Sequence, residues 1–362
     1  MGQRMSAARV ALGRSLEWLA ERTKLPVSEL LRLEAGQREF RASELSRIAG
    51  ALALGVEWFM TESPPAVRSL RADRMEGPRV ARFDLLLEGL ARDVELLRSL
   101  GTLQAETIST PAPVRGSLED TERVARDVRQ RLDVGTGPLI DLDRAAEKLG
   151  VHTLCLRLDP REPDGAYVAL EGGGVVIVNG VQPPGRRRFT LAHELGHHVF
   201  QDQYSTDWLG AGSQDAEKVI NAFAVHLLLP RDSLVARWQQ LAPTHEPRMA
   251  LLIVAVEYRV SWSVACAQCE RFHLIEEAQH EALTAWSPSR ADYMEMGLRI
   301  EEELVPPSLS PMFTRAVVSA YRTNRLTGNR AIEMLRGTLE LAELPSSDDV
   351  PLQAYLSELE AP

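Results

Sequence analysis

Short amphipathic segments fill the first sixty residues of the chain. Apolar residues recur at helical spacing in five stretches within residues 7–60. Ser15 is placed to cap the second stretch, Pro26 to open the third, and Ser43 to cap the fourth. Gly36 follows the third stretch, where a residue that readily adopts positive φ commonly ends a helix. The pattern predicts a small bundle of five helices.

A longer apolar stripe follows between residues 80 and 100. Its members are separated by gaps of 3 and 4 residues, as on the apolar side of a coiled coil. They are Val80, Phe83, Leu87, Leu90, Val94 and Leu97. Such a helix could pair with a second copy in a homodimer, or it could lie on the following domain, since further leucines widen the stripe. Pro-rich breaks at residues 63–65 and 107–114 flank it, which is typical of a linker region.

Helical and strand-like patterns then alternate in a way that predicts an α+β domain. Helical spacing covers residues 118–132 and 139–149. Three apolar runs separated by glycines follow, and such runs are typical of strands joined by turns. They are residues 151–156, 166–170 and 175–179. After residue 276 the chain is acidic and helical again. The expected fold class is mainly α with a small antiparallel sheet (α+β).

A zinc-binding pattern, H-E-x-x-H, lies directly after the third strand-like run, at His193, Glu194 and His197. Residues four apart on a helix lie about 40° apart around its axis, so the two imidazoles can hold one ion. Glu194 lies between them and can take a proton from water at that ion. The pattern predicts a zinc hydrolase with Glu194 as the catalytic residue.

Two histidines need a third ligand, and the extended motif that ends in a third His is absent. Phe200 replaces its Gly and Gln203 replaces its His. Glu217 lies downstream in a second helical pattern, and Asn221 follows one turn later on the same face. This spacing matches the gluzincin arrangement, in which a Glu from a second helix completes the site. Asn221 would then orient the His193 ring as a neighbour that does not itself bind the metal.

Other polar residues near the motif are weaker candidates. Tyr167, Tyr204 and His226 could each stabilise an oxyanion, but no spacing argument selects one of them. His226 follows Glu217 by nine residues, about 180° around a helix, which favours packing. The C-x-x-C pair Cys266–Cys269 could bind a second zinc, but it lies at helical spacing among apolar residues, which favours burial.

Composition narrows the class of protein. The 362 residues are 44% hydrophobic and 25% charged, as in ordinary globular proteins. No apolar run of membrane-spanning length and no leader-like N-terminus occurs, so we expect a cytoplasmic protein with no membrane partner. Three cysteines do not suggest a disulfide framework. The net charge is −10, but residues 1–62 carry nine basic and eight acidic side chains, so any nucleic acid should bind there.

The N-terminal bundle resembles the Cro and phage-repressor class of helix-turn-helix domains, known as the XRE type. The residues that carry the resemblance are Leu19–Ala20, Leu25, Leu30, Leu33–Gly36, Leu45, Ile48–Ala49 and Leu52. The resemblance implies that the segment from Pro26 to Leu33 enters the major groove of DNA. The DNA-binding candidates are Lys24, Ser28, Glu29, Arg32 and Arg38. Lys24, Arg32 and Arg38 are expected to contact phosphates.

Three positions depart from the XRE pattern. Leu16 stands where a polar residue usually opens the second helix, and Val27 and Glu29 stand where Gln, Ser or Thr commonly read bases. Glu29 could accept a hydrogen bond from cytosine N4, although it would repel phosphate. The alternative is a bundle used only for protein contacts or dimerisation.

The central block resembles the ImmA/IrrE family of metallopeptidases. The resemblance is carried by R-R-F-T-L-A-H-E-L-G-H at residues 187–197 and by E-x-x-x-N-x-F-A-x-x-L-L-L-P at residues 217–230. It implies Zn²⁺ as the cofactor and a helix-turn-helix repressor as the substrate, since members of the family are thought to relieve repression in this way. Many members carry a second Glu two residues after the first, where this chain has Val219. Glu217 is thus the carboxylate left for the metal in this motif.

Together these features predict four regions. They are an XRE-type domain at residues 1–62, a linker with a long helix at 63–115, an ImmA/IrrE-like zinc metallopeptidase domain at 116–275, and an acidic helical region at 276–362. The preferred hypothesis is a DNA-binding regulator whose zinc endopeptidase cleaves a repressor, antitoxin or toxin partner. The alternative is a non-proteolytic transcriptional regulator or antitoxin that uses the peptidase-like domain to bind metal or a partner.

Overall fold

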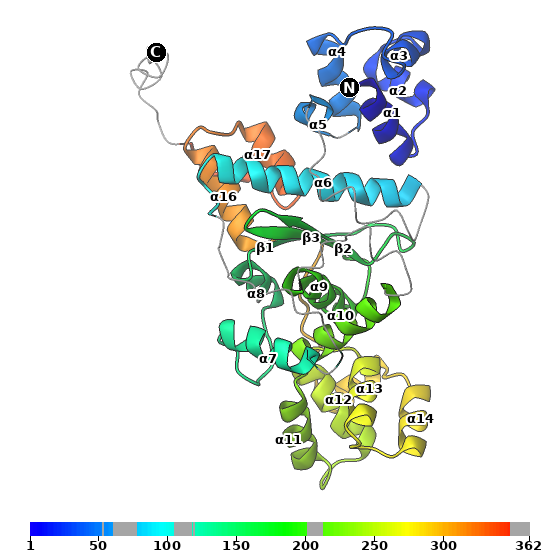
Figure 1. The fold of residues 1–362 in the computed structure, drawn as a ribbon, viewed down its shortest axis with the longest axis vertical. Helices are drawn as coiled ribbons and strands as arrows, with labels where there is room; N and C mark the ends of the chain where they lie inside the picture. The colour runs from blue at the N-terminus through cyan, green and yellow to red at the C-terminus, as the bar shows by residue number, and fades with distance from the viewer. Residues whose placement is uncertain (53, 61–77, 105–117, 119, 201–212, 348–362) are drawn as a thin grey trace.

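The computed structural model describes the chain apart from residues 53, 61–77, 105–117, 119, 201–212 and 348–362. The expected breaks at residues 63–65 and 107–114, and Tyr204, lie outside the described residues. Along its long axis the molecule stacks the N-terminal helices, one long helix, a sheet, and two further layers of helices (Figure 1). The α+β fold class is confirmed.

The N-terminal domain is the five-helix bundle that the sequence predicts. Its helices are α1 (Gly2–Ala11), α2 (Leu16–Thr23), α3 (Val27–Glu34), α4 (Ala42–Leu52) and α5 (Val56–Met60). Ser15 caps α2, accepting a hydrogen bond from the Trp18 N–H at 3.1 Å. The expected Ser43 cap is wrong, because α4 begins at Ala42. The Glu44 carboxylate instead accepts the Arg41 N–H at 3.0 Å.

The sheet contains four strands in the order β2-β3-β1-β4. The strands are β1 (Val151–Leu156), β2 (Gly165–Leu170), β3 (Gly173–Asn179) and β4 (Ser308–Leu309). β2 and β3 pair antiparallel, and β1 pairs with β4 antiparallel. The expectation of a purely antiparallel sheet is wrong, because β1 and β3 are parallel. The first three strands alternate in direction, but β3 lies between β1 and β2 and therefore runs beside a strand of its own direction.

The long helix α6 (Pro78–Ser99) covers one face of this sheet together with α16 (Pro311–Arg322) and α17 (Gly328–Leu335). Five positions of the predicted stripe are buried, namely Phe83, Leu87, Leu90, Val94 and Leu97, while the side chain of Val80 is not among those described. The apolar stripe of α6 thus packs on the chain's own sheet, which is the predicted alternative to pairing with a second copy. Pairing of α6 through this stripe with a second copy is excluded in this arrangement.

The other side of α6 faces the N-terminal bundle (Figure 1). Leu85 joins the apolar core of the bundle. Arg4 of α1 pairs with Glu88 at 2.8 Å and donates to the carbonyl of Trp58 at 2.7 Å. One helix therefore packs against both the bundle and the sheet.

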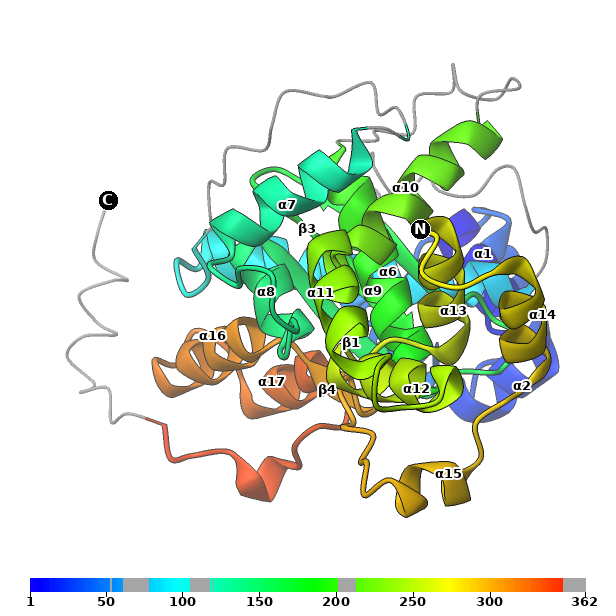
Figure 2. The same ribbon diagram turned by 90° about the horizontal axis from the view of Figure 1, so that it is seen from below.

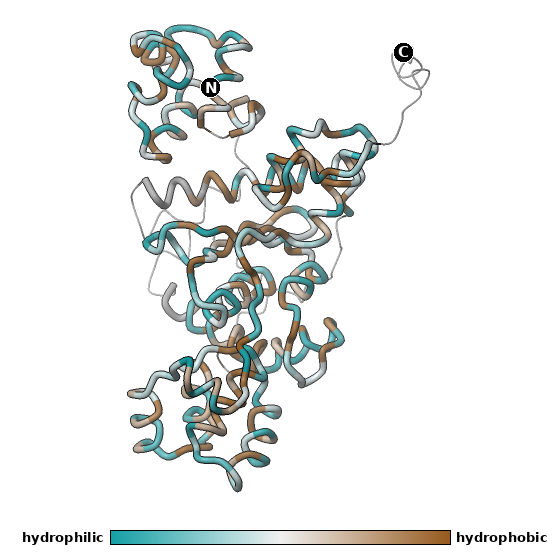
Figure 3. The backbone as a smooth tube through the Cα atoms, turned by 180° about the vertical axis from the view of Figure 1, so that it is seen from behind, coloured by the Kyte–Doolittle hydropathy of each residue, from teal (hydrophilic) through white to brown (hydrophobic). Residues whose placement is uncertain are grey.

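The opposite face of the sheet is covered by α8 (Leu142–Lys148) and α9 (Pro184–Val199). α10 (Ser213–Leu228) runs beside α9, and α7 (Thr121–Arg131) packs on α10 (Figure 2). Alternate residues of β3 face the two layers: Val175 and Ile177 face α6, whereas Val176 and Val178 face α9. Apolar positions accordingly concentrate in the sheet and its flanking helices (Figure 3).

The remaining described helices form the layer farthest from the N-terminal bundle and the segments that return from it (Figure 1). They are α11 (Arg231–Leu241), α12 (Pro247–Glu257), α13 (Trp262–Arg271), α14 (Glu277–Ala285) and α15 (Arg290–Glu295). The 3₁₀ turn η3 (Leu341–Glu343) follows α17 and contacts it. Within the described residues, no single helix is long and apolar enough to cross a membrane. Two pairs of consecutive helices, each pair sharply bent at its break, meet the length and composition criteria only when the two helices are taken together.

Candidate metal centre

Helix α9 holds the H-E-x-x-H motif against the sheet. Pro183 precedes it and Pro184 is its first residue, where the missing proline N–H costs no helical hydrogen bond. Leu191, Leu195 and Val199 recur one turn apart and are buried, as their spacing predicts. The opposite side of the helix, which carries the two histidines, is thereby directed away from the sheet and toward α10.

The structure brings together the three predicted ligands. One ligand atom each from His193, His197 and Glu217 lies within 4.8 Å of the others. The two Nε2 atoms are 3.2 Å apart, and His193 Nε2 is 3.5 Å from Glu217 Oε2. Two donors bound to one tetrahedral zinc at about 2.0–2.1 Å would lie about 3.3 Å apart. The donor set of two imidazoles and a carboxylate therefore fits Zn²⁺ in both chemistry and spacing.

Asn221 lies behind the first of these ligands. Its Oδ1 is 3.1 Å from His193 Nδ1. With the amide oxygen facing the ring, Nδ1 carries the proton and Nε2 presents a lone pair to the site. Electron pairs from two side chains, together with the carboxylate of Glu217, then converge on one point, which is an arrangement that favours a cation.

The carboxylate of Glu194 is buried beside the first residue of β2. An added Cβ on Gly165 would lie 2.3 Å from Thr190 Cγ2 and 3.1 Å from Glu194 Oε1. Glycine at this position therefore leaves the space that the carboxylate occupies. This contact was not predicted from the sequence, although a glycine in a strand often marks a place where another group approaches closely.

Gly196 sets the distance between the two helices that supply the ligands. An added Cβ there would lie 2.9 Å from Ile220 Cγ2 and 3.1 Å from Phe223 Cδ1, both on α10. Glycine therefore lets α10 approach closely enough for Glu217 to reach the histidines. A glycine inside an otherwise helical pattern is the signal that could have shown this.

Two arginines fix the first turns of α9. Arg188 is fully buried, pairs with Glu303, and donates to the carbonyls of Leu139 and Arg259 at 2.6 and 3.1 Å. Arg187 donates to the carbonyl of Glu303 at 3.1 Å. In the sequence these arginines stand out only as part of the motif at residues 187–197. No local pattern points to their partner so far along the chain.

Tyr167 and His226, the two candidate oxyanion donors among the described residues, contact other side chains. The Tyr167 hydroxyl contacts His198 Nδ1 at 2.7 Å, and burial raises the pKa of that hydroxyl. His226 is buried against Phe272, with ring centroids 6.1 Å apart. Burial lowers the pKa of His226 to about 4, so it is neutral, and its interpretation as a packing residue is confirmed.

The C-x-x-C pair is also a packing feature. Cys266 and Cys269 are free and buried in the core of the domain. Burial raises the pKa of the Cys266 thiol to about 11 and that of Cys269 to about 12. The burial expected from their helical spacing among apolar residues is confirmed.

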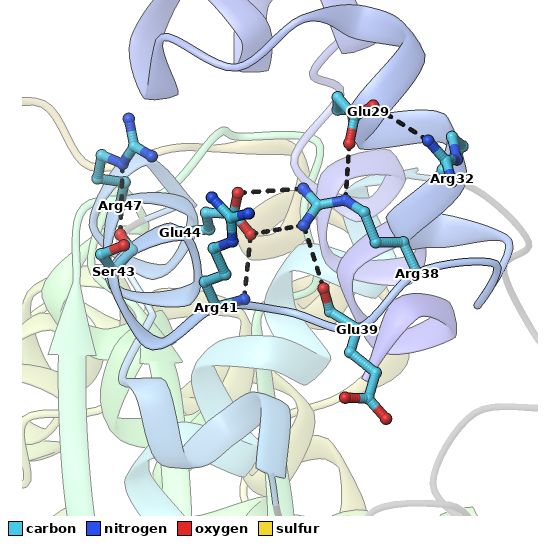
Figure 4. A network of polar contacts seen from close by, with 8 residues as sticks. All are labelled: Glu29, Arg32, Arg38, Glu39, Arg41, Ser43, Glu44 and Arg47. Atoms are coloured by element: carbon cyan, nitrogen blue, oxygen red, sulfur yellow. Dashed lines mark hydrogen bonds and ion pairs between the residues drawn. The ribbon is translucent and has the colours of Figure 1, made fainter.

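The predicted DNA-binding residues lie on and beside α3, at the end of the molecule. Lys24, Ser28 and Arg32 are exposed. Arg38, in contrast, is held by acidic side chains: it binds Glu44 at 3.0 and 3.1 Å and pairs with Glu29 at 2.7 Å (Figure 4). The structure therefore gives Arg38 an internal role where the sequence suggested a phosphate contact.

Comparison with known proteins agrees with this geometry. Residues 5–59 match the helix-turn-helix family, and residues 146–270 match the IrrE N-terminal-like domain. The chain therefore combines an XRE-type helix-turn-helix domain with an IrrE-like domain, and both sequence resemblances are confirmed. A solved Mycobacterium tuberculosis transcriptional regulator shares 18% identity with a TM-score of 0.30, over 49% of this chain and 50% of that one. The match thus spans half of that protein's length. No curated protein matches the chain.

Proposed function

We propose that the protein is a DNA-binding regulator whose IrrE-like domain is a zinc-dependent endopeptidase, and that it cleaves a repressor or antitoxin-like partner. One observation carries the peptidase half: His193, His197 and Glu217 converge from two helices with Glu194 beside them. The helix-turn-helix domain, with α3 exposed at the far end, supports the DNA-binding half.

Each side chain has a definite task in this proposal. Zinc held by the two histidines and Glu217 would act as a Lewis acid toward the peptide carbonyl and water. Glu194 Oε takes the proton of the attacking water and returns it to the nitrogen of the leaving amine. Asn221 Oδ1 holds the His193 ring so that Nε2 faces the site.

The test combines metal analysis with partner cleavage. Protein purified without chelators should contain about one zinc per chain, as a three-ligand site requires. A helix-turn-helix protein encoded by the neighbouring gene should be cut by the wild-type protein and left intact by Glu194→Gln. Glu277→Gln, an exposed carboxylate change on α14, should cut normally and serves as the matched control.

Two outcomes would contradict the peptidase half. Protein that contains no zinc when purified without chelators would contradict the proposed zinc site. Zinc-loaded protein that binds DNA but leaves such partners intact, with Glu194→Gln behaving like wild type, would support the non-proteolytic regulator.

A further inference from the structure

The outward face of α3 has a composition suited to reading bases. Leu30 and Leu33 point into the core of the bundle and are fully buried. Ser28, Leu31 and Arg32 are exposed on the other side, and Leu31 is a large apolar side chain left 50% accessible. A major groove offers thymine methyl groups to such a residue and guanine O6 and N7 to an arginine. This face therefore presents more base-reading than phosphate-binding chemistry.

A row of alternating charges lies beside that face (Figure 4). Glu44 accepts two hydrogen bonds from Arg38, which lowers the pKa of the Glu44 carboxyl. Arg38 also pairs with Glu29 Oε2 at 2.7 Å, and Glu29 Oε1 accepts from Arg32 Nη1 at 3.3 Å. Two carboxylates thus alternate with two guanidinium groups. Glu29 is neutralised on both sides and held in one position.

Arg38 and Arg32 differ in what they leave available. The Arg38 side chain is 19% exposed, and its guanidinium is engaged by Glu29, Glu44 and the carbonyl of Glu39. The Arg32 side chain is 53% exposed, and its single hydrogen bond within the described residues uses Nη1. The rest of the Arg32 fork is available, and a planar fork fits guanine O6 and N7 in a bidentate manner.

We infer that Arg32 reads a guanine in the major groove and that Glu29 is the positioning residue that presents it. Arg38 and Glu44 hold Glu29 in turn. Holding a long side chain near its bound geometry lowers the entropy lost on binding. This inference rests on the DNA-binding half of the proposed function and replaces the expected phosphate contacts of Arg32 and Arg38.

The experiment begins with selection of binding sites from random duplex DNA by the full-length protein. Affinity is then measured for the selected site and for its single-base variants at several salt concentrations. Arg32→Lys keeps the charge but loses the bidentate fork, so preference for guanine at one position should fall by roughly 5- to 100-fold. The salt dependence should stay unchanged, because the number of phosphate contacts is the same.

Glu29→Ala distinguishes positioning from simple structural support. Removing a negative charge from the DNA face should raise affinity for non-specific DNA, while guanine preference should fall because Arg32 loses its support. A merely structural role would instead lower both affinities together and lower the melting temperature. Lys24→Ala is the contrasting control, in which affinity for all sequences should fall equally and the salt slope should drop by about 1.

The outcomes separate the inference from the function on which it rests. If the wild-type protein selects no DNA sequence, both the proposed DNA binding and the role of Arg32 are contradicted. Wild-type protein that selects a site, with Arg32→Lys keeping the same guanine preference, would overturn the reading role and leave DNA binding intact. Arg32→Lys with lost guanine preference and Glu29→Ala with full preference would overturn the positioning role of Glu29.

Discussion

Arg188 on α9 and Glu303, 115 residues further along the chain, form an ion pair near the start of the helix that carries the H-E-x-x-H motif. The arginine is fully buried, and the Glu303 side chain is 12% exposed. The second carboxylate oxygen of Glu303 accepts the Leu142 N–H, which opens α8. One acidic side chain thus joins the starts of two helices that lie on the same face of the sheet.

Neutralising Glu303 should destabilise the protein. Glu303→Gln leaves the Arg188 charge buried without its counter-ion, so the free energy of unfolding should fall by about 3 kcal/mol. Urea unfolding measures this change. Glu302→Gln is the matched control, because Glu302 is 61% exposed and lies 3.6 Å from Arg187, and its effect should stay below about 1 kcal/mol. Equal effects of the two changes would contradict the role given to the buried pair.

A methyl group on Gly196 should weaken zinc binding. Gly196→Ala gains up to about 1 kcal/mol of helix propensity, but its Cβ meets Ile220 and Phe223 at 2.9 and 3.1 Å, and overpacking costs about 1–3 kcal/mol. The clash should win, and α10 should move Glu217 away from the histidines. Zinc titration against a competing chelator measures the loss.

The double variant tests the cause of that loss. Ile220→Ala removes the nearest methyl group, so Gly196→Ala/Ile220→Ala should bind zinc more tightly than Gly196→Ala alone. If the second change brings no recovery, helix separation does not explain the effect.

Removing the amide behind His193 should lower metal affinity without unfolding the domain. Asn221 is exposed and makes its contact through Oδ1, so Asn221→Ala should weaken zinc binding by roughly 10- to 100-fold. The melting temperature of the zinc-free protein should change little. Asn221→Asp keeps an acceptor at the same place and should retain the affinity. An unchanged affinity in Asn221→Ala would show that the hydrogen bond does not orient the ligand.

Stability should depend on pH through Asp143 of α8. Burial raises the pKa of Asp143 to about 7, and the charges of Glu147 and Asp141 add to the rise. The folded protein thus keeps a proton that the unfolded chain releases near pH 4, so this group lowers stability as pH rises from about 4 to 7. Asp143→Asn removes that dependence. Its stability relative to wild type should grow by up to about 1.4 kcal/mol per pH unit in this window.

Urea unfolding of both proteins at several pH values measures that difference. Asp232→Asn, whose side chain is 70% exposed, should give a constant difference from wild type over the same range. A constant difference for Asp143→Asn as well would show that Asp143 titrates normally.

Local patterns predicted the helices and the candidate ligand residues but not how distant segments meet. Helical spacing pairs His193 with His197 and Glu217 with Asn221, because each pair lies on a helix whose geometry is known in advance. The meeting of the two pairs was expected from the gluzincin arrangement and not from periodicity. The parallel pairing of β1 with β3 did not follow from the apolar runs, because the same runs are compatible with β1 lying next to β2 or next to β3. The capture of Arg38 by Glu29 and Glu44 joins three elements, and no periodicity encodes such a contact.

The match to the IrrE-like domain ends at residue 270, but the sheet and the helices packed on it include residues outside the match. β4 and α16 come from beyond that point, and α6 comes from before residue 146, so one face of the sheet is covered by segments outside the match. Residues 146–270 transplanted alone would carry half of a core and expose its apolar side to water. In this chain the segment that matches the family is therefore shorter than the segment that folds together, and a fragment prepared for metal-binding studies should extend from α6 to α17.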